Sequence, residues 1–287
     1  MNDRTPPNLI LRQWTPSDLP ELREAMAVCF GDAEEDVDAF FRAFQNGLGD
    51  CLVAALPEEG RPEGRLVASG YILTGPLLRS AGTAVPSEYL YALGCLPAWR
   101  GRGFGMFLHR EAFLGSADGG PVRCFIPASE GLHRTYSREG GLEPLGSIRS
   151  AVIPRGKITA APPETEILTP EEYSRRREKI LEGFPHADFP AAWFSLMADY
   201  GNLFLAIPGA LAAVIPMEDR CVAAELLCAG ADPAEALAGV AEQCPAERYE
   251  VRTPVFFPGH GEIRRFVYAN RRMENLPDSF WYPFGLE

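Results

Sequence analysis

Apolar residues in the first half of the chain recur in two different periods. Short runs that alternate or are continuously apolar predict strands, and longer stretches with apolar residues three or four positions apart predict helices. The predicted strands cover residues 8–14, 49–56, 64–75, 88–95, 122–127 and 142–154, and the predicted helices cover residues 15–30, 33–46, 104–117 and 129–141. This succession of strands and helices predicts a domain of mixed α/β class.

Two local patterns refine this prediction. Thr15 followed by Pro16 is typical of a helix start, because threonine caps the first N–H groups and proline suits the first helical position. The polar stretch PEEGRPEG at residues 57–64 separates two strand candidates. It predicts an antiparallel hairpin with a long turn.

The composition changes near the middle of the chain. Residues 154–167 are rich in proline and small residues and have little periodicity, which is typical of a boundary. Helices are predicted after it at 169–184, 189–200 and 232–244, and strands at 202–207, 210–217, 220–229, 247–255 and 265–271. We therefore expect a first domain at 1–154, a linker at 155–167 and a second, smaller domain at 168–287. The order of elements in the second domain weakly repeats that of the first.

The charge balance limits the kind of partner. The chain of 287 residues has 39 acidic and 27 basic residues, a formal net charge of −12. Nucleic-acid binding is driven by cationic side chains that neutralise phosphates, so this balance argues against a nucleic-acid partner. A cationic or amine-bearing partner fits better.

Cysteine usage and the length of apolar runs bear on the compartment. The seven cysteines form no C-x-x-C pair and lie mostly in apolar runs, which is typical of reduced thiols rather than of a disulfide framework or a zinc site. The N-terminal residues lack the basic stretch and apolar core of a secretory signal. No run approaches the roughly 20 apolar residues of a membrane span. We expect a soluble, cytoplasmic protein with no membrane partner.

The most unusual local sequence is RGRGFG, Arg100–Gly105, between a predicted strand and a predicted helix. The N–H groups at a glycine-containing turn that opens a helix point toward one place, and the helix dipole adds about half a positive charge there. This predicts an anion site, to which Arg100 and Arg102 add charge. The motif lacks the lysine and hydroxyl residue of a Walker loop and the third glycine of the dinucleotide fingerprint. Taken alone, it also fits a tight turn with solvated arginines.

In this segment the sequence resembles the GCN5-related N-acetyltransferases. Their pyrophosphate loop reads Arg/Gln-x-x-Gly-x-Gly/Ala, which Arg100–Gly105 fits, and CLPAW at residues 95–99 stands where the family has a strand end followed by proline and an aromatic residue. Residues 126–144 resemble the second motif of the family, a helix carrying a tyrosine shortly before a glycine and the next strand. The order of elements from residue 8 to about residue 152 also matches.

The resemblance implies a mixed, mostly antiparallel central sheet flanked by helices. It also implies a V-shaped split between the fourth and fifth strands, where acetyl-CoA inserts its pantetheine arm. Backbone hydrogen bonds to the pantetheine and the acetyl carbonyl are then expected from Leu93, Gly94 and Cys95. The pyrophosphate is expected at Arg100, Gly101, Arg102, Gly103, Phe104, Gly105 and Met106.

For acetyl transfer, one proton must leave the amine, whose pKa is about 10.4, and another must reach the sulfur of the leaving CoA thiolate. The resemblance implies that Tyr136 is the acid near the sulfur. The alternative is a tyrosine that packs its helix against the sheet. Glu88 lies where some family members place a carboxylate, so it is the candidate base, acting through water. The alternative is a solvated glutamate at a strand end.

Other titratable residues have ordinary interpretations. Glu130 and Glu139 are expected at solvated helix positions, and His109 and His133 are expected on the surface. No cluster of His, Cys and carboxylate residues has the spacing of metal ligands, so we expect no metal. Glu287 could deliver a carboxylate to a cleft.

The second half departs from the family pattern at the place of the loop. Only ADP, residues 231–233, separates the strand from the helix there, with no arginine and no glycine loop. FPGHGE at residues 257–262 follows a different strand, and we interpret it as a turn. The second half therefore resembles a degenerate copy of the acetyltransferase fold that covers or shapes the acceptor side. The alternative is that it only stabilises the first half or forms a dimer contact.

The expected function is transfer of an acetyl group from acetyl-CoA, as cosubstrate, to a primary amine of a small molecule or peptide in a ternary complex. The alternative is a non-catalytic module that binds CoA or a protein partner. The acceptor is expected to be a positively charged amine held in a cleft between the two halves. The sequence is also compatible with a homodimer.

Overall fold

The computed structural model describes residues 9–113, 120–139 and 142–286. The chain forms two compact units. Unit 1 comprises Met1–Gly75, Pro86–Glu143 and Ala269–Arg271, and unit 2 comprises Pro76–Val85, Pro144–Tyr268 and Arg272–Glu287. The predicted linker at 155–167 thus lies inside unit 2. The domain limits expected from the sequence, 1–154 and 168–287, remain a prediction.

Unit 1 contains strands in the order β1-β2-β3-β4-β5. The β1–β2 and β2–β3 pairs are antiparallel, and the β4–β5 pair is parallel. The strands are β1 Ile10–Gln13, β2 Gly49–Glu58, β3 Arg61–Ser80, β4 Thr83–Cys95 and β5 Val122–Phe125, with the outer ends of β3 and β4 in unit 2. Each of these strands overlaps a predicted one.

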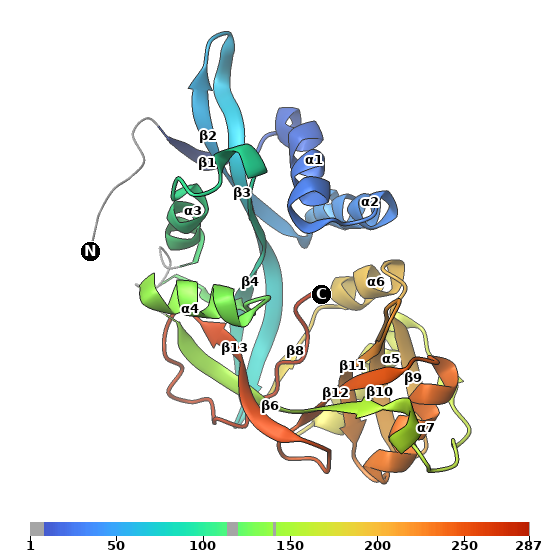
Figure 1. The fold of residues 1–287 in the computed structure, drawn as a ribbon. Helices are drawn as coiled ribbons and strands as arrows, with labels where there is room; N and C mark the ends of the chain where they lie inside the picture. The colour runs from blue at the N-terminus through green and yellow to red at the C-terminus, as the bar shows by residue number, and fades with distance from the viewer. Residues whose placement is uncertain (1–8, 114–119, 140–141, 287) are drawn as a thin grey trace. The chain divides into compact units, whose positions relative to one another are not determined.

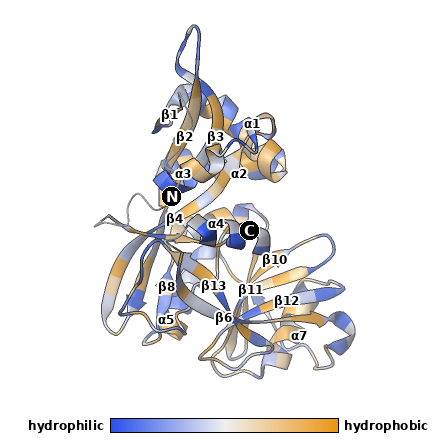
Figure 2. Cartoon of the chain, turned by 60° about the vertical axis from the view of Figure 1, so that its left-hand side comes forward, coloured by the Kyte–Doolittle hydropathy of each residue, from blue (hydrophilic) through white to orange (hydrophobic). Residues whose placement is uncertain are grey.

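The β2–β3 hairpin is longer than the sequence predicts. The two strands stay paired to Glu58 and Arg61, so the turn is Glu59 and Gly60 and not the eight residues 57–64. Gly60 has a φ of 79°, which glycine adopts without strain. The tip of the hairpin is hydrophilic and mostly exposed (Figure 2). A strand with water on both faces shows no alternation of apolar and polar residues, so its sequence predicts a turn.

The helices described in unit 1 are α1 Leu19–Phe30, α2 Glu34–Ala43, α3 Phe104–Phe113 and α4 Glu130–Glu139 (Figure 1). A capping box of Thr15 and Asp18 on a short 3-10 turn leads into α1, at the predicted helix start. Phe104 and Leu108 of α3 pack with Val67 of β3 in a buried cluster. The apolar face of α3 therefore fixes this helix on the sheet.

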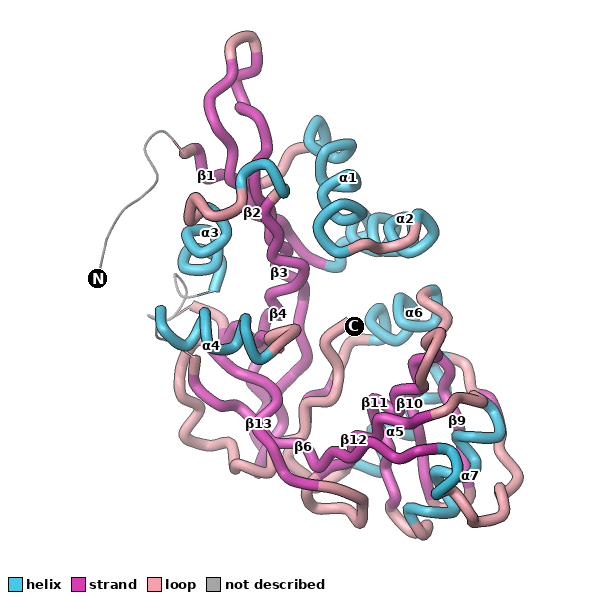
Figure 3. The backbone as a smooth tube through the Cα atoms, viewed as in Figure 1, coloured by secondary structure: helices cyan, strands magenta, loops and turns pink. Residues whose placement is uncertain are grey.

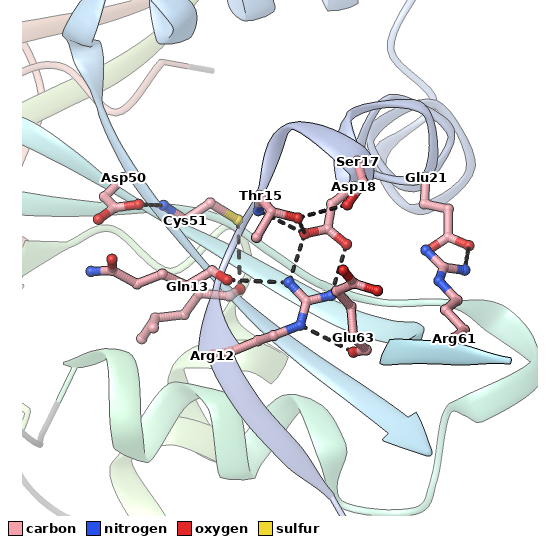
Figure 4. Close-up of polar contacts among 11 residues, drawn as sticks. Arg12, Gln13, Thr15, Ser17, Asp18, Glu21, Asp50, Cys51, Arg61 and Glu63 are labelled. Carbon is pink, nitrogen blue, oxygen red and sulfur yellow. Dashed lines mark hydrogen bonds and ion pairs between the residues drawn. The ribbon is translucent and has the colours of Figure 1, made fainter. Parts of the chain in front are cut away.

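A partly buried ion pair joins β1 to the start of α1 (Figure 4). Arg12 donates to both carboxylate oxygens of Asp18, at 2.6 and 2.7 Å, and the Thr15 N–H donates to Asp18 Oδ2 at 2.7 Å. Burial alone would raise the pKa of Asp18, but the hydrogen bonds from Arg12 and Thr15 outweigh it and hold this pKa below its ordinary value. The network fixes the beginning of α1, whose last turn reaches the candidate site.

Within unit 2 the strand order is β13-β6-β12-β11-β10-β9-β7. Its pairs are antiparallel at β6–β12, β10–β11, β9–β10 and β7–β9, whereas β11 and β12 are parallel. The strands are β6 Glu143–Pro154, β7 Glu166–Ile167, β8 His186–Asp188, β9 Leu203–Ile207, β10 Ala210–Pro216, β11 Cys221–Cys228, β12 Arg248–Pro254 and β13 Glu262–Ala269. The short β8 pairs with Leu77–Arg79, at the unit 2 end of β3. The sequence did not predict β7 or β8.

The helices described in unit 2 are α5 Pro170–Leu181, α6 Ala191–Asp199 and α7 Pro233–Gln243. Leu237 and Val240 of α7 pack in a cluster with the strands β9 to β12. Glu225 on β11 is fully buried and accepts hydrogen bonds from Tyr173, Arg177 and Trp281. A buried carboxylate is tolerated because all three donors are present.

Both units combine helices with mostly antiparallel strands, which confirms the predicted fold class. All seven cysteines lie in the described part of the chain, and none of them forms a disulfide there. Across residues 9–113, 120–139 and 142–286, no helix has the length and apolar character needed to cross a membrane.

Candidate active site

The strands β4 and β5 separate after a short paired segment. They pair only over Ser87–Tyr89 and Val122–Cys124 among the described residues, and β4 then runs on to Cys95. Ala92, in the unpaired part of β4, has a φ of 45°, which is uncommon for a residue with a Cβ. The structure therefore contains an opened parallel pair, with the sequence-predicted residues Leu93 to Cys95 on its β4 side.

The glycine-arginine loop, Arg100–Gly103, lies between the end of β4 and α3, and the last two residues of the motif, Phe104 and Gly105, begin α3 (Figure 3). Gly101 and Gly103 have φ values of 77° and 84°, so both positions require the conformational freedom of glycine. A Cβ built on either glycine meets no described atom within 4 Å apart from the adjoining residues, so the space beside the loop is open. The Phe107 N–H donates to the Gly103 carbonyl at 2.9 Å, which leaves the first N–H groups of α3 without helical partners. This geometry can hold an anion.

The two arginines of the loop contact the end of β4 and the turn after it. Arg100 Nε donates to the Cys95 carbonyl at 3.1 Å, and the Cys29 thiol donates to the same oxygen at 3.5 Å. The Arg102 guanidinium lies 4.7 Å from the ring centre of Trp99. Both arginines remain exposed, so their charge is available beside the loop.

The last turn of α1 covers the end of β4. A Cβ added at Gly94 would lie 3.1 Å from the ring of Phe30 and 3.3 Å from Cys29 Cβ, which is tighter than ordinary contact. The next residue, Cys95, faces the other side, because its Cβ is 3.8 Å from the place of a Cβ on Gly105. Gly94 thus permits the close approach of α1. Phe30 is nevertheless 45% exposed, so part of its side chain is open to solvent beside the strand end.

Tyr136 is buried on α4. Its ring stacks on His109 with a centroid distance of 4.4 Å and meets the ring of Phe125 edge-on at 4.9 Å. Burial raises the pKa of the phenol to about 12, so it is protonated at neutral pH. This position is compatible with both interpretations from the sequence, the acid and the packing tyrosine.

The surface position expected for His109 is wrong. This residue is fully buried on α3, and its ring also stacks on Phe113 at 5.2 Å. Burial, with a smaller contribution from Arg110, lowers its pKa to about 4. The sequence did contain a signal, since His109 stands four residues before Phe113 and next to Leu108 in the apolar stripe.

Glu88 is tied to the neighbouring strand. It stands opposite Arg123 in the β4–β5 register, and Arg123 Nε donates to Glu88 Oε2 at 2.7 Å. The Glu88 side chain is still 32% exposed, so water can reach it. The ion pair gives Glu88 a structural task at the point where the two strands separate.

The remaining titratable candidates from the sequence are Glu130, His133, Glu139 and Glu287. Glu130 is exposed, as expected, whereas His133 is half-buried with its ring nitrogen 3.5 Å from Ser137 Oγ. The side chain of Glu139 and the whole of Glu287 lie outside the described residues.

Unit 2 has a similar opened pair without the anion site. β11 pairs in parallel with β12 only over Cys221–Ala223 in the described structure, then continues, and α7 follows it. The start of α7 is capped by Asp232, whose Oδ1 accepts the Ala234 N–H at 2.7 Å. A carboxylate of the chain itself thus satisfies one of the first N–H groups of α7, and the absence of a cofactor site in the second half stays a prediction.

No family model and no curated protein matches the sequence. Solved structures do share its fold. A GCN5-related N-acetyltransferase from Kribbella flavida superposes with a TM-score of 0.62 at 17% identity, over 91% of this chain and 70% of that chain. A GCN5-related N-acetyltransferase from Anabaena variabilis gives 0.62 at 15%, over 91% and 72% of the two chains. Eis1 from Mycobacterium abscessus gives 0.56 at 16%, over the same shares. This chain has the fold of the GCN5-related N-acetyltransferases.

The likeness to these structures extends beyond unit 1. The three matches each cover 91% of the chain, so the likeness includes unit 2. Because the identities are low, the likeness shows the fold alone, and the function has to be argued from the residues of the site.

Proposed function

We propose that this chain transfers an acetyl group from acetyl-CoA to a primary amine. The observation that carries the proposal is found in unit 1, where an opened parallel strand pair ends at a glycine-arginine loop and a free helix start. Beyond Tyr89, β4 has no β5 partner among the described residues, so it can offer backbone groups to an extended ligand, and the loop offers N–H groups and positive charge to its phosphates. One ligand with both parts is a coenzyme A thioester.

The residues of unit 1 fit this cosubstrate. The open space beside Gly101 and Gly103, and the exposed arginines Arg100 and Arg102, suit a pyrophosphate. The backbone of residues 93–95 suits the pantetheine arm. When bound, acetyl-CoA would supply an acetyl group activated as a thioester.

Tyr136 is the proposed hydrogen donor to the leaving sulfur. Its pKa of about 12 lies above the roughly 8.5 of a thiol in water, so full proton transfer to a solvated thiolate would be unfavourable by about 5 kcal/mol. Burial also disfavours the charged form of the sulfur, which reduces this difference. The phenol thus keeps its proton until negative charge develops next to it.

Glu88 is the proposed base, acting through water. Its partial exposure allows a water molecule to lie between the carboxylate and an amine, and Arg123 fixes the orientation of the carboxylate. The acceptor is proposed to be a small or exposed cationic amine. The net charge of −12 supports this through the encounter of cations with the surface, and the exposed ring of Phe30 offers a face for an ammonium group.

The ion pair of Glu88 favours a second candidate function. If Glu88 only holds β4 to β5, the site lacks a base, and the chain is then a module that binds CoA without turnover. Isothermal titration with acetyl-CoA should show one site per chain under both proposals. Thiol release with a panel of polyamines, aminoglycosides, amino acids and peptides separates them, because only the enzyme releases thiol in an amine-dependent way.

A further inference from the structure

His109 lies in the middle of α3 with both ring nitrogens buried and without hydrogen-bond partners among the described residues. Buried polar atoms of native proteins are nearly always paired, because an unpaired one lowers the stability of the fold. A leucine of similar volume would fill the position without this loss. The imidazole therefore has a task other than filling the core.

The contacts of the imidazole indicate what this task is. Its ring lies nearly parallel to that of Tyr136, at 4.4 Å and an interplanar angle of 22°, and nearly parallel to that of Phe113, at 5.2 Å and 26°. Phe125 meets Tyr136 at an angle of 85°, so it contacts the phenol ring in an edge arrangement. Among the described rings, His109 is the one that stacks on the face of Tyr136.

The position of His109 on α3 links this stack to the loop. α3 begins at Phe104, directly after the glycines of the loop, and α4 carries Tyr136. His109 is a side chain of the loop-bearing helix that contacts the proposed acid. A flat, uncharged ring at this place restrains both the distance and the tilt of the phenol relative to α3.

We propose that His109 is a positioning residue that holds the ring of Tyr136 in the orientation needed for the acid role. The inference rests on the proposed acetyltransferase function. The imidazole is smaller than a phenyl ring and fits between Tyr136 and Phe113 at these short separations. The unpaired nitrogens of His109 lower the stability of the fold, whereas its flat ring orients the phenol of Tyr136. Natural proteins commonly accept a lower stability at functional sites.

The test compares three variants of the full chain. His109→Leu keeps the volume but removes the flat face, so we expect kcat to fall about tenfold to hundredfold, with KM for acetyl-CoA within about twofold. Its Tm should be unchanged or higher by a few degrees, because two unpaired nitrogens are removed. His109→Phe keeps a flat ring of larger size and should give an intermediate kcat.

Phe41→Leu is the matched control, because Phe41 is a buried ring of unit 1 whose described ring contacts are with Phe40, Phe44 and Tyr71 and lie outside the His109 stack. We expect it to lower Tm while kcat stays within about threefold. A His109→Leu variant that retains the wild-type kcat would overturn the proposal. A His109→Leu variant in which kcat and Tm both fall, as a simple loss of packing predicts, would also overturn the proposal.

A second readout does not depend on turnover. Nitration of tyrosines by tetranitromethane, mapped by mass spectrometry, should be faster at Tyr136 in His109→Leu than in the wild type or in Phe41→Leu. Equal nitration in all three proteins would refute the positioning role. If the wild type acetylates no amine but Tyr136 is nitrated faster in His109→Leu than in the wild type, the result supports the contact between His109 and Tyr136. It then contradicts only the proposed acetyltransferase function.

Discussion

Gly103 tests the anion site with one substitution. Gly103→Glu places a carboxylate beside the proposed phosphates, so we expect acetyl-CoA binding to be lost in a calorimetric titration. Gly60→Glu is the matched control, because Gly60 has a similar positive φ and equally open surroundings at the tip of the β2–β3 hairpin. Loss of binding in both variants, or in neither, would remove the loop from the cosubstrate site.

The phenol of Tyr136 should matter for turnover and not for binding. We expect Tyr136→Phe to leave the Kd for acetyl-CoA nearly unchanged and to lower kcat by roughly 10² to 10⁴-fold. Tyr71→Phe is the control, since Tyr71 is another buried tyrosine of unit 1 and its phenol has no partner among the described residues. A kcat effect below tenfold would exclude Tyr136 as the acid and leave the packing interpretation.

His109 should make the stability of the chain sensitive to acid. The folded imidazole has a pKa of about 4 and an unfolded one about 6.5, so the unfolded state binds more protons between these values. Stability from this group is present above about pH 6.5 and falls as the pH drops toward 4, by roughly 2–3 kcal/mol at pH 4.5. Tyr136, whose ring stacks on the imidazole, stays neutral over this range.

The measurement is the difference in Tm between pH 7.5 and pH 4.5. We expect a smaller difference in His109→Leu than in the wild type, because other acidic groups titrate equally in both proteins. An equal difference in the two proteins would contradict the depressed pKa.

The sequence could indicate some residues of the site and not others. The loop glycines and Tyr136 belong to motifs with fixed spacing, so the sequence alone pointed to them. The burial of His109 depends on α4 packing over α3, and the ion pair of Glu88 depends on the register of β4 with β5. Such contacts between distant segments leave no local pattern in the chain.

At the scale of elements, the register of β4 and β5 decides what Glu88 does. If Glu88 is the base, Glu88→Gln should lower kcat by roughly 10²-fold and remove the acidic limb of the pH profile of kcat/KM. If Glu88 only pairs with Arg123, the same variant should lower Tm and change kcat less than tenfold. We expect the first result. The second would remove Glu88 from the base role and leave it as a structural residue, with the base elsewhere in the site.

Most helices and strands could be predicted because their apolar periodicity is strong. The exceptions have physical reasons. The solvated tip of the β2–β3 hairpin has no apolar alternation, and β7 and β8 have two and three residues, too few for any period to show.

At the scale of the whole molecule, unit 1 depends on a segment near the other end of the chain. Asn270 donates through its side chain to the Phe113 carbonyl at 3.2 Å and accepts the Arg123 N–H at 3.1 Å. The composition of residues 154–167 contains no sign that residues 269–271 belong to unit 1. A fragment ending at Arg155 would lack these bonds and is a poor test of unit 1.

Asn270 can be tested in the full chain. Asn270→Ala leaves a buried N–H and a buried carbonyl without these partners, so we expect Tm to fall by several degrees, in line with about 1–3 kcal/mol. Asn46→Ala, at an exposed position of unit 1, should have little effect. Equal Tm values in the two variants would show that residues 269–271 do not stabilise unit 1.

The central claim is that unit 1 uses acetyl-CoA to acetylate an amine. The most direct measurement follows free thiol and acetylated amine together, for the full chain and for Gly103→Glu, across the amine panel. We predict amine-dependent thiol release by the wild type, with equal amounts of thiol and acetylated amine, and none by Gly103→Glu. Acetyl-CoA binding without amine-dependent release for any amine, or release that persists in Gly103→Glu, would contradict the account.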